Sequence, residues 1–220
     1  MARTRIIETN QGIQAAATVA RFDAMQRGFR DRGFLATGKL IDRGIASGRG
    51  LEIGPGPGYL GLEWLKSTDG TSLVAVEISR EMIRMAEKNR AEYRMEDRAE
   101  YRPGNAMDLP LEDASVDHVF STGSLHEWEN PAAVVKEAHR VLRPGGRLHI
   151  GDLRRNLNPL MLLMMRTTVH EPEMKAGLIS SVRAAYLPEE MRRLMEWSPF
   201  VDFTVTSDPF GLEIGARKAA

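Results

Sequence analysis

Short apolar runs alternate with amphipathic stretches through the middle of the chain. Residues 50–53, 71–77 and 116–121 are rich in Leu, Ile, Val and Ala, which is typical of strands buried in a parallel sheet. The stretches 59–65 and 79–94 carry apolar residues at helical spacing, and the second begins with a serine that suits the N-cap position. This alternation predicts an α/β domain built on a parallel sheet.

The same pattern continues to residue 151. We expect a weak strand at 99–102 and a helix over 131–142, because proline suits the first turn of a helix. The Pro-Gly-Gly run 144–146 predicts a turn, and the apolar residues of 147–151 predict the next strand.

Both ends of the chain differ from this middle part. Residues 14–46, 159–186 and 188–196 are expected to be helical. Two β-like runs follow, at 201–206 and 212–216. The link between these two runs is too short to hold a crossover helix, so they are expected to form an antiparallel hairpin.

The composition of the chain excludes several classes of partner and chemistry. The 220 residues suit a single domain. Lys and Arg together number 30, as do Asp and Glu, so no overall basic charge is present and we expect no nucleic-acid partner. The chain has no cysteine, which excludes disulfides and thiolate nucleophiles. Because no apolar run is long enough for a membrane span and the N-terminal residues lack a signal-peptide pattern, we expect a cytoplasmic protein.

Three alternating glycines follow the first strand and precede a helix. Gly54, Gly56 and Gly58 allow positive φ angles and close backbone approach, and the helix N-terminus favours an anionic or polar group. Residues 56–61 match the Gly-x-Gly-x-x-Gly pattern of dinucleotide-binding loops, which is a weak signal alone. Glu77 ends the next strand, where a carboxylate can accept both ribose hydroxyls of NAD or of S-adenosylmethionine (SAM).

A second carboxylate favours SAM. Glu52 lies two residues before Gly54, where it would repel the pyrophosphate of NAD and attract the sulfonium and ammonium groups of SAM. The glycine run contains no Lys or Arg to neutralise a phosphate, and the Gly-Lys-Ser/Thr sequence of phosphate-binding loops does not occur.

At this point the sequence resembles the class I SAM-dependent methyltransferases, and most of all their small-molecule branch, which includes the ubiquinone/menaquinone methyltransferases. The motifs that carry the resemblance lie in the family's order. They are the glycine motif 52–58, the acidic motif 76–79, the adenine-edge motif 104–110, the segment 120–126 after the fourth strand, and the helix, turn and strand of 137–148.

The resemblance covers about residues 49–150 and implies a fold, a cofactor and a set of contacts. The fold would be a Rossmann-like, seven-stranded, mostly parallel sheet with helices on both faces and a C-terminal antiparallel hairpin. Asn105 stands where the family has Asp, and its amide can still accept from the adenine amino group. The implied SAM-binding residues are Glu52, Gly54, Gly56, Gly58, Glu77, Ile78, Asn105, Ala106 and Ser121.

One histidine is a candidate for catalysis. His126 follows a strand at the end where open α/β sheets bind ligands, so its imidazole can serve as a general base. The alternative is that it packs in the loop or bonds a backbone carbonyl. Glu127 and Asp152 also lie at strand ends, but their spacing gives only a weak metal signal, so no metal is expected. His118 and His149 lie within predicted strands and are interpreted as structural.

The segments outside the resemblance are expected to select the acceptor. We expect a single domain over 1–220, with an N-terminal helical cap at 1–46 and a helical acceptor-side insertion at 152–196. Residues 157–165 are apolar and rich in Met, which suits burial in the core, a dimer contact or a cap over a hydrophobic acceptor. A homodimer is therefore one of the open alternatives.

The activity implied is methyl transfer from SAM to a small acceptor by direct in-line displacement. Close and aligned placement of the two reactants would supply most of the rate. Two alternatives stay open at this point. One is an NAD-dependent oxidoreductase, although the sequence lacks a clear Tyr-x-x-x-Lys pattern. The other is a SAM-binding domain that serves as a non-catalytic partner subunit.

Overall fold

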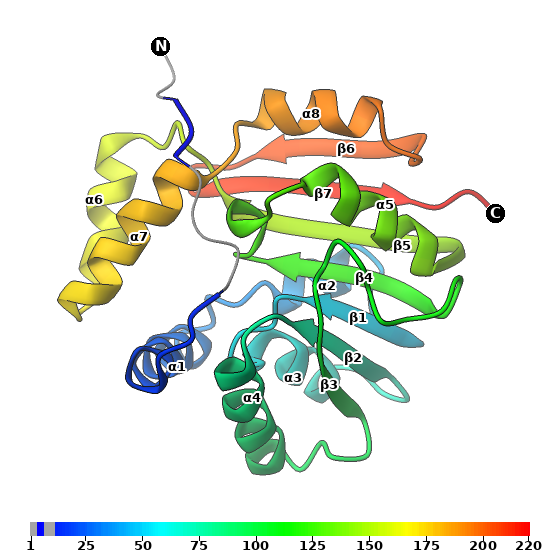
Figure 1. Cartoon of the computed structure of the whole chain (residues 1–220), viewed down its shortest axis with the longest axis horizontal. Helices are drawn as coiled ribbons and strands as arrows, with labels where there is room; N and C mark the ends of the chain where they lie inside the picture. Colours follow the sequence, from blue (N-terminus) through cyan, green and yellow to red (C-terminus); the bar gives the residue numbers. More distant parts are fainter. Residues whose placement is uncertain (1–3, 7–11) are drawn as a thin grey trace.

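A seven-stranded sheet runs through the centre of the molecule (Figure 1). The computed structural model describes residues 4–6 and 12–220. The strands are β1 (Arg49–Ile53), β2 (Ser72–Glu77), β3 (Ala99–Pro103), β4 (Val116–Thr122), β5 (Leu142–Leu153), β6 (Asp202–Ser207) and β7 (Gly211–Arg217). Their order across the sheet is β3-β2-β1-β4-β5-β7-β6.

Helices cover both faces of this sheet. They are α1 (Ala16–Asp31), α2 (Thr37–Asp42), α3 (Tyr59–Lys66), α4 (Arg80–Tyr93), α5 (Pro131–Val141), α6 (Pro159–Thr168), α7 (Pro172–Ala184) and α8 (Pro188–Glu196), with a short 3-10 helix, η1 (Leu125–Glu127). One core cluster joins the sheet to α5 and α8, and the other joins it to α2, α3 and α4. Helices α1, α6 and α7 stand beside the sheet (Figure 1).

The strand directions confirm the expected fold class. Neighbouring strands from β3 to β5 pair in parallel, whereas β7 is antiparallel to both β5 and β6. The predicted hairpin is therefore correct, and β7 inserts between β5 and β6. Two helix starts also follow the sequence, because the Ser79 and Asn130 side chains accept hydrogen bonds from the backbone N–H groups of Met82 and Ala133.

Two expectations about local structure are wrong. The Pro144–Gly146 run does not separate a helix from a later strand, because β5 already begins at Leu142 and the pairing with β4 shifts register between Val116 and His118. The single helix expected over 159–186 is two helices, α6 and α7. Pro172 begins the second one, since a proline lacks the N–H that would continue the first.

One cross-strand row passes through all seven strands on the face that α2, α3 and α4 cover. Directly paired residues share a face of the sheet. The row consists of Tyr101, Ala75, Glu52, Phe120, His149, Gly215 and Thr204. Three members carry a buried polar atom without a hydrogen-bond partner, namely Tyr101 Oη, Glu52 Oε2 and His149 Nδ1. Such atoms cost stability, so each needs an explanation.

Among the described residues, none of the helices has the length and apolar character to cross a membrane.

The Tyr101 hydroxyl explains the last glycine of the run. Gly58 precedes α3 with φ +87°, and a Cβ at this position would overlap Tyr101 Oη. Gly58 therefore has both a conformational and a steric reason to be glycine.

We predict that Gly58→Ala lowers the free energy of unfolding by about 2 kcal/mol, and with it the melting temperature. The causes are the left-handed backbone conformation, which alanine disfavours, and the overlap of its Cβ with Tyr101 Oη. Tyr101→Phe should leave the melting temperature unchanged or raise it, because it removes a buried hydroxyl that has no partner. The double variant should recover part of the Gly58→Ala loss. Scanning calorimetry of the four proteins measures these differences, and a marked loss of stability in Tyr101→Phe alone would contradict this account.

Candidate functional site

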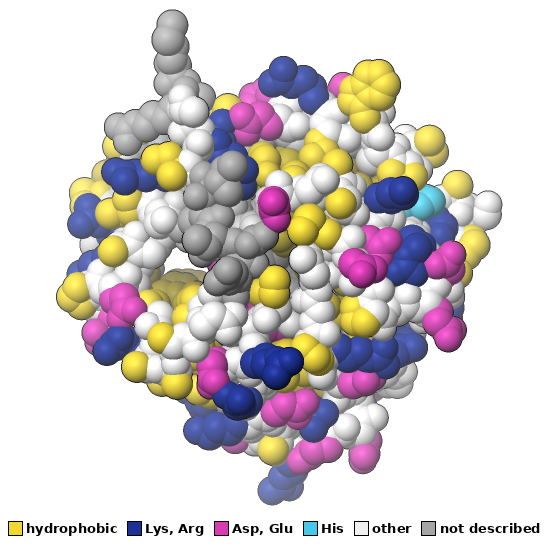
Figure 2. All heavy atoms as spheres, viewed as in Figure 1, with side chains coloured by type: hydrophobic (Ala, Val, Ile, Leu, Met, Phe, Trp, Pro, Cys, Tyr) yellow, Lys and Arg dark blue, Asp and Glu magenta, His cyan; other side chains and the backbone are white. Residues whose placement is uncertain are grey.

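A cavity of about 950 Å³ lies at the ends of the strands where open α/β sheets bind ligands. Its walls come from α1, α2 and α7 and from the segments that follow β1, β2, β3, β4 and β5. Figure 2 shows a recess with hydrophobic side chains on the left of the molecule, and a mixture of acidic and basic side chains on the rest of that face. The volume lies near the upper end of the usual range for one ligand, so a cofactor and a small acceptor can share it.

The glycine loop forms the floor beside β1 and β2. Gly54 has φ +66°, and a Cβ there would lie 2.7 Å from the Ser124 Cβ in the loop after β4. Gly56 donates its backbone N–H to Glu77 Oε2 at 3.2 Å, and Ser79 donates its backbone N–H to Glu77 Oε1 at 2.9 Å. The Glu77 carboxylate thus ties the loop to the start of α4.

The predicted ribose and adenine residues lie together along one wall. Glu77, Ile78, Asn105 and Ala106 all line the cavity. Burial raises the pKa of Glu77, and the backbone hydrogen bonds oppose this change. Asn105 Oδ1 accepts the backbone N–H of Met107 at 2.9 Å, so this oxygen already has one partner inside the protein. The Asn105 amide nitrogen can donate toward an adenine ring nitrogen, which sequence reasoning did not consider.

Glu52 lines the cavity from β1 but is almost fully buried, with 2 % of its surface exposed. Its Oε2 atom has no hydrogen-bond partner, and burial raises its pKa to about 8. A cationic ligand beside Glu52 would restore the ionised form.

Two of the predicted cofactor residues lie behind the wall. Gly58 and Ser121 do not line the cavity. The Ser121 hydroxyl is fully buried, donates to the Ile53 carbonyl at 2.8 Å and shares a hydrogen bond with Ser124 Oγ at 2.7 Å. Its position supports the glycine loop and the loop after β4. A direct contact of Ser121 with the cofactor stays a prediction.

A polar network joins α1 to the glycine loop. Asp23 of α1 is buried and accepts hydrogen bonds from Tyr59 Oη and Asn89 Nδ2, both at 2.9 Å. The same Asn89 amide donates to the Pro57 carbonyl at 2.9 Å. Sequence reasoning missed this network, because each residue looks like an ordinary polar helix position. It holds the α1 side of the cavity against the loop.

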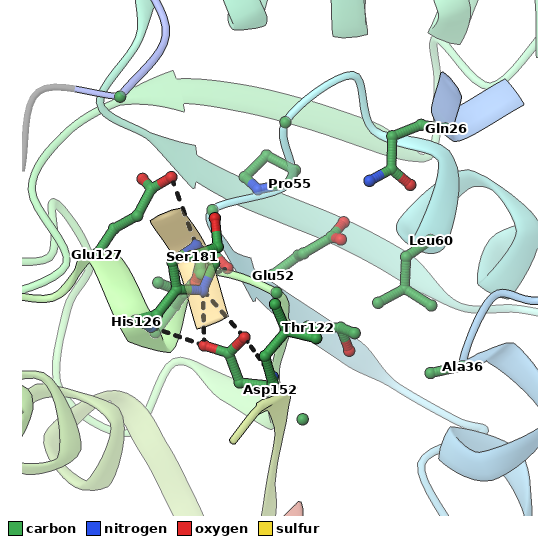
Figure 3. Close-up of a pocket in the computed structure, with 18 of the residues that line it drawn as sticks. Gln26, Ala36, Glu52, Pro55, Leu60, Thr122, His126, Glu127, Asp152 and Ser181 are labelled. Carbon is green, nitrogen blue, oxygen red and sulfur yellow. Dashed lines mark hydrogen bonds and ion pairs between the residues drawn. The ribbon is translucent and has the colours of Figure 1, made fainter. Parts of the chain in front are cut away.

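His126 and Asp152 face one another on the opposite side (Figure 3). His126 Nδ1 lies 3.0 Å from both carboxylate oxygens of Asp152, and the backbone N–H groups of His126 and Leu153 donate to the same carboxylate at 2.6 and 2.7 Å. Both side chains are buried, and both residues line the cavity. Asp152 is therefore a partner of the His126 ring, and the role of His126 as a base stays a prediction.

This pair resembles the base and orienting carboxylate of many acid–base enzymes. When Nδ1–H donates to Asp152, Nε2 keeps its lone pair. Glu127 Oε1 lies 4.0 Å from Nε2 and would favour the protonated ring after proton transfer. In residues 4–6 and 12–220, no group of three or more potential ligands is arranged to hold a metal ion.

Apolar side chains of α1 and of the segment after it form one wall of the cavity, and α7 forms another; the first lies in the expected N-terminal cap and the second in the expected insertion. Two other lining residues, Gly12 and Ile13, had no clear signal in the sequence. Gly12 lies beside Ile78, and Ser79 Oγ donates to the Ile13 carbonyl. Their placement depends on the tertiary fold, which a periodicity argument does not reach. The rest of the expected cap at 1–46 includes residues 1–3 and 7–11, which lie outside the described residues.

The Met-rich segment forms most of α6. Of the three alternatives for this segment, burial in the core does not hold, because α6 has no buried residue. Leu160 and Leu163 are 64 % and 57 % exposed, whereas Met165 lines the cavity. A cap over the acceptor and a contact with another chain both stay open.

Comparison with known proteins agrees with this site. A family model described as a methyltransferase domain matches residues 51–150. The 27-O-demethylrifamycin SV methyltransferase of Amycolatopsis mediterranei is 36 % identical over 123 residues, which cover 53 % of this chain and 45 % of that protein. The erythromycin 3''-O-methyltransferase of Saccharopolyspora erythraea is 32 % identical over 103 residues, which cover 47 % of this chain and 34 % of that protein. The matched parts thus span less than half the length of these relatives.

A solved structure has the same fold over the whole chain. It is a Methanococcus maripaludis protein assigned as an S-adenosyl-L-methionine-dependent methyltransferase, with a TM-score of 0.74 and 24 % identity. The match covers 100 % of this chain and 98 % of that one. The fold of this chain therefore has a counterpart among solved structures.

The buried Glu52 carboxyl generates a prediction about stability and pH. Its folded pKa of about 8 exceeds the ordinary value of 4.5, so the native state retains a proton that the unfolded chain releases between these pH values. Stability should fall as pH rises through this window, by up to about 4 kcal/mol from this group alone. Chemical denaturation at pH 5 to 8.5 measures the slope.

Glu52→Gln is the matched control, because its amide does not titrate. We expect a smaller loss of stability over the same pH range in this variant. Identical pH slopes in the two proteins would show that Glu52 is ionised in the native state.

Proposed function

We propose that this chain is a class I SAM-dependent methyltransferase and that it transfers the methyl group of SAM to a hydroxyl oxygen of a small, largely apolar acceptor. The observation that carries the choice of oxygen is the His126–Asp152 pair, which is built to accept a proton. The two curated relatives compared above also act on oxygen, as their names state.

The cavity residues fit SAM in charge and shape. Glu52 lines the cavity with a carboxyl group, which suits a ligand with sulfonium and ammonium charges. Glu77 and Ile78 would hold the ribose and one adenine face, and Asn105 and Ala106 the adenine edge. When bound, SAM supplies an electrophilic methyl carbon on its sulfonium.

The chain's own contribution to the reaction is position and proton transfer. His126 Nε2 would accept the proton of the acceptor hydroxyl as the oxygen attacks. Asp152 would hold the ring in the required orientation and stabilise its charged form, because its carboxylate contacts Nδ1 and is fixed by two backbone N–H groups. Both residues come from strand-end segments, so the rigid sheet sets their geometry.

The acceptor would lie between α1 and α7. Phe22 and Met25 line the cavity from α1, and Met174 and Leu178 line it from α7. Apolar walls of this kind suit a molecule with an apolar body. We propose that the N-terminal cap and the 152–196 insertion belong to one domain with the sheet and form these acceptor walls.

The two alternative functions, an NAD-dependent oxidoreductase and a non-catalytic SAM-binding subunit, have less support. The family match favours SAM over NAD, since the glycine run belongs to the matched methyltransferase domain. A non-catalytic SAM-binding subunit would have no need of the buried imidazole–carboxylate pair, so the pair supports turnover. A cytoplasmic location and a homodimer stay predictions.

We predict that calorimetric titration detects binding of SAM and S-adenosylhomocysteine (SAH) and none of NAD. Glu52→Gln should weaken SAM about tenfold, which corresponds to the loss of one charge-assisted contact. It should weaken SAH less, because SAH lacks the sulfonium charge. Binding of NAD without SAM would sink the proposal.

We predict that His126→Ala lowers kcat by about 10²- to 10⁴-fold toward hydroxyl acceptors while the affinity for SAM stays the same. Asp152→Asn should lower kcat as well and shift the pH profile of kcat, since the orienting carboxylate is lost. A screen with labelled SAM across small hydroxylated molecules supplies the acceptor for these measurements.

His170→Ala is the matched control, because it removes an exposed imidazole that does not line the cavity. Its turnover should equal that of the unaltered protein. Full turnover in His126→Ala would show that positioning alone drives the reaction.

A further inference from the structure

His149 is a buried imidazole that the proposed reaction does not use. It lies on β5, is 1 % exposed and lines the cavity near α2. Its Nδ1 atom has no hydrogen-bond partner. The sequence-based interpretation of His149 as a structural residue leaves this buried atom, and the place of the side chain in the cavity wall, unexplained.

The absence of a side chain beside His149 leaves space for a ligand atom. Gly151 follows on the same face of β5 and also lines the cavity. A Cβ at Gly151 would lie 3.7 Å from both His149 Nε2 and Thr122 Oγ1. Two polar atoms therefore flank a space that any other residue at position 151 would partly fill.

The space beside His149 and Gly151 is also bordered by charged side chains whose charges cancel. Glu213 of β7 pairs with Gly151 across the sheet and lines the cavity. Its two carboxylate oxygens are held by Lys39 and Arg43, and Lys39 also pairs with Asp208 at 3.3 Å. Two cations thus face two carboxylates, so the lobe offers no net charge to a ligand.

The imidazole itself is also uncharged. Burial lowers the pKa of His149 to about 4, and the nearby Arg43 adds to this effect. A neutral imidazole presents either one donor or one acceptor through a given nitrogen, and the Thr122 hydroxyl can do both. An anionic or cationic ligand group would lose its hydration here without gaining a counter-ion.

We propose that the lobe formed by Thr122, His149, Gly151 and Glu213 recognises a second, uncharged hydroxyl group of the acceptor. A hydroxyl group donates and accepts at once, which matches the polar atoms that flank Gly151. This inference rests on the proposed function and narrows the acceptor class. The acceptor would be an apolar molecule with at least two hydroxyl groups, one methylated near His126 and one held near His149.

Matched pairs of aromatic probes test this inference in the SAH-saturated protein. The probes are 1- and 2-naphthol and the isomeric dihydroxynaphthalenes, which keep the apolar body and add one hydroxyl at each possible spacing. Their dissociation constants are measured by calorimetry, so the result does not depend on turnover. We expect at least one diol to bind about tenfold more tightly than the corresponding naphthol.

Substitutions at His149 and Gly151 test whether the preference for diols arises in this lobe. His149→Leu should reduce the affinity for the preferred diol to that for the naphthol, and His149→Asn should keep part of the difference. Gly151→Ala should also remove the preference, because its Cβ makes only ordinary contacts with the protein but fills the space. His118→Leu is the control, since His118 is buried on the same face and does not line the cavity.

Equal binding of diols and naphthols, no binding of either, or a preference that persists in both His149→Leu and Gly151→Ala would overturn the inference. If His149→Leu fails to bind SAH because it misfolds, His149→Asn and Gly151→Ala decide. Failure of the proposed function is seen separately, as the absence of SAM binding or of methyl transfer to any hydroxyl acceptor.

Discussion

The carboxylate of Glu77 is the contact on which the rest of the site depends. It accepts backbone N–H groups from the glycine loop and from the first residues before α4, and so fixes the ends of β1 and β2 relative to one another. The loop fixed in this way then positions its neighbours. Ser124 packs against Gly54, and Asn89 links the Pro57 carbonyl to Asp23 of α1. The buried charge has a cost, which the hydrogen bonds from the backbone partly offset.

Both functional sides of the cavity are built on the same sheet. β1 and β2 carry the two carboxylates of the cofactor side, whereas His126 follows β4 and Asp152 lies at the end of β5. The carboxyl ends of parallel strands lie at one edge of the sheet. Residues far apart in the sequence are therefore brought close together by the sheet itself. The antiparallel β7 extends this edge and brings Glu213 beside Gly151. The helices outside the sheet then enclose the space.

The sequence predicted the fold correctly, and most residues it assigned to the cofactor line one side of the cavity, because both depend on local patterns. A few neighbouring residues are enough to predict the strands from their apolar runs, the loop from its glycine motif, and the place of Glu77 at a strand end. The acceptor side depends on which distant segments come together, and no local pattern encodes this. Asp152 was considered only as a weak metal ligand, yet it is the partner of His126. His149 looked structural because its strand was predicted correctly, while the space beside it depends on Gly151 and α2.

Phe120 has a particular place in the cross-strand row, because it lies between Glu52 and His149. Its ring is fully buried and packs against Trp64, with ring centroids 5.5 Å apart. A benzene ring carries no exchangeable hydrogen, so it cannot take part in a chain of hydrogen bonds. No chain of hydrogen-bonded side chains therefore runs along this row from His149 to Glu52. A proton can pass between them only through the cavity that both residues line, although their charges still act on one another through space.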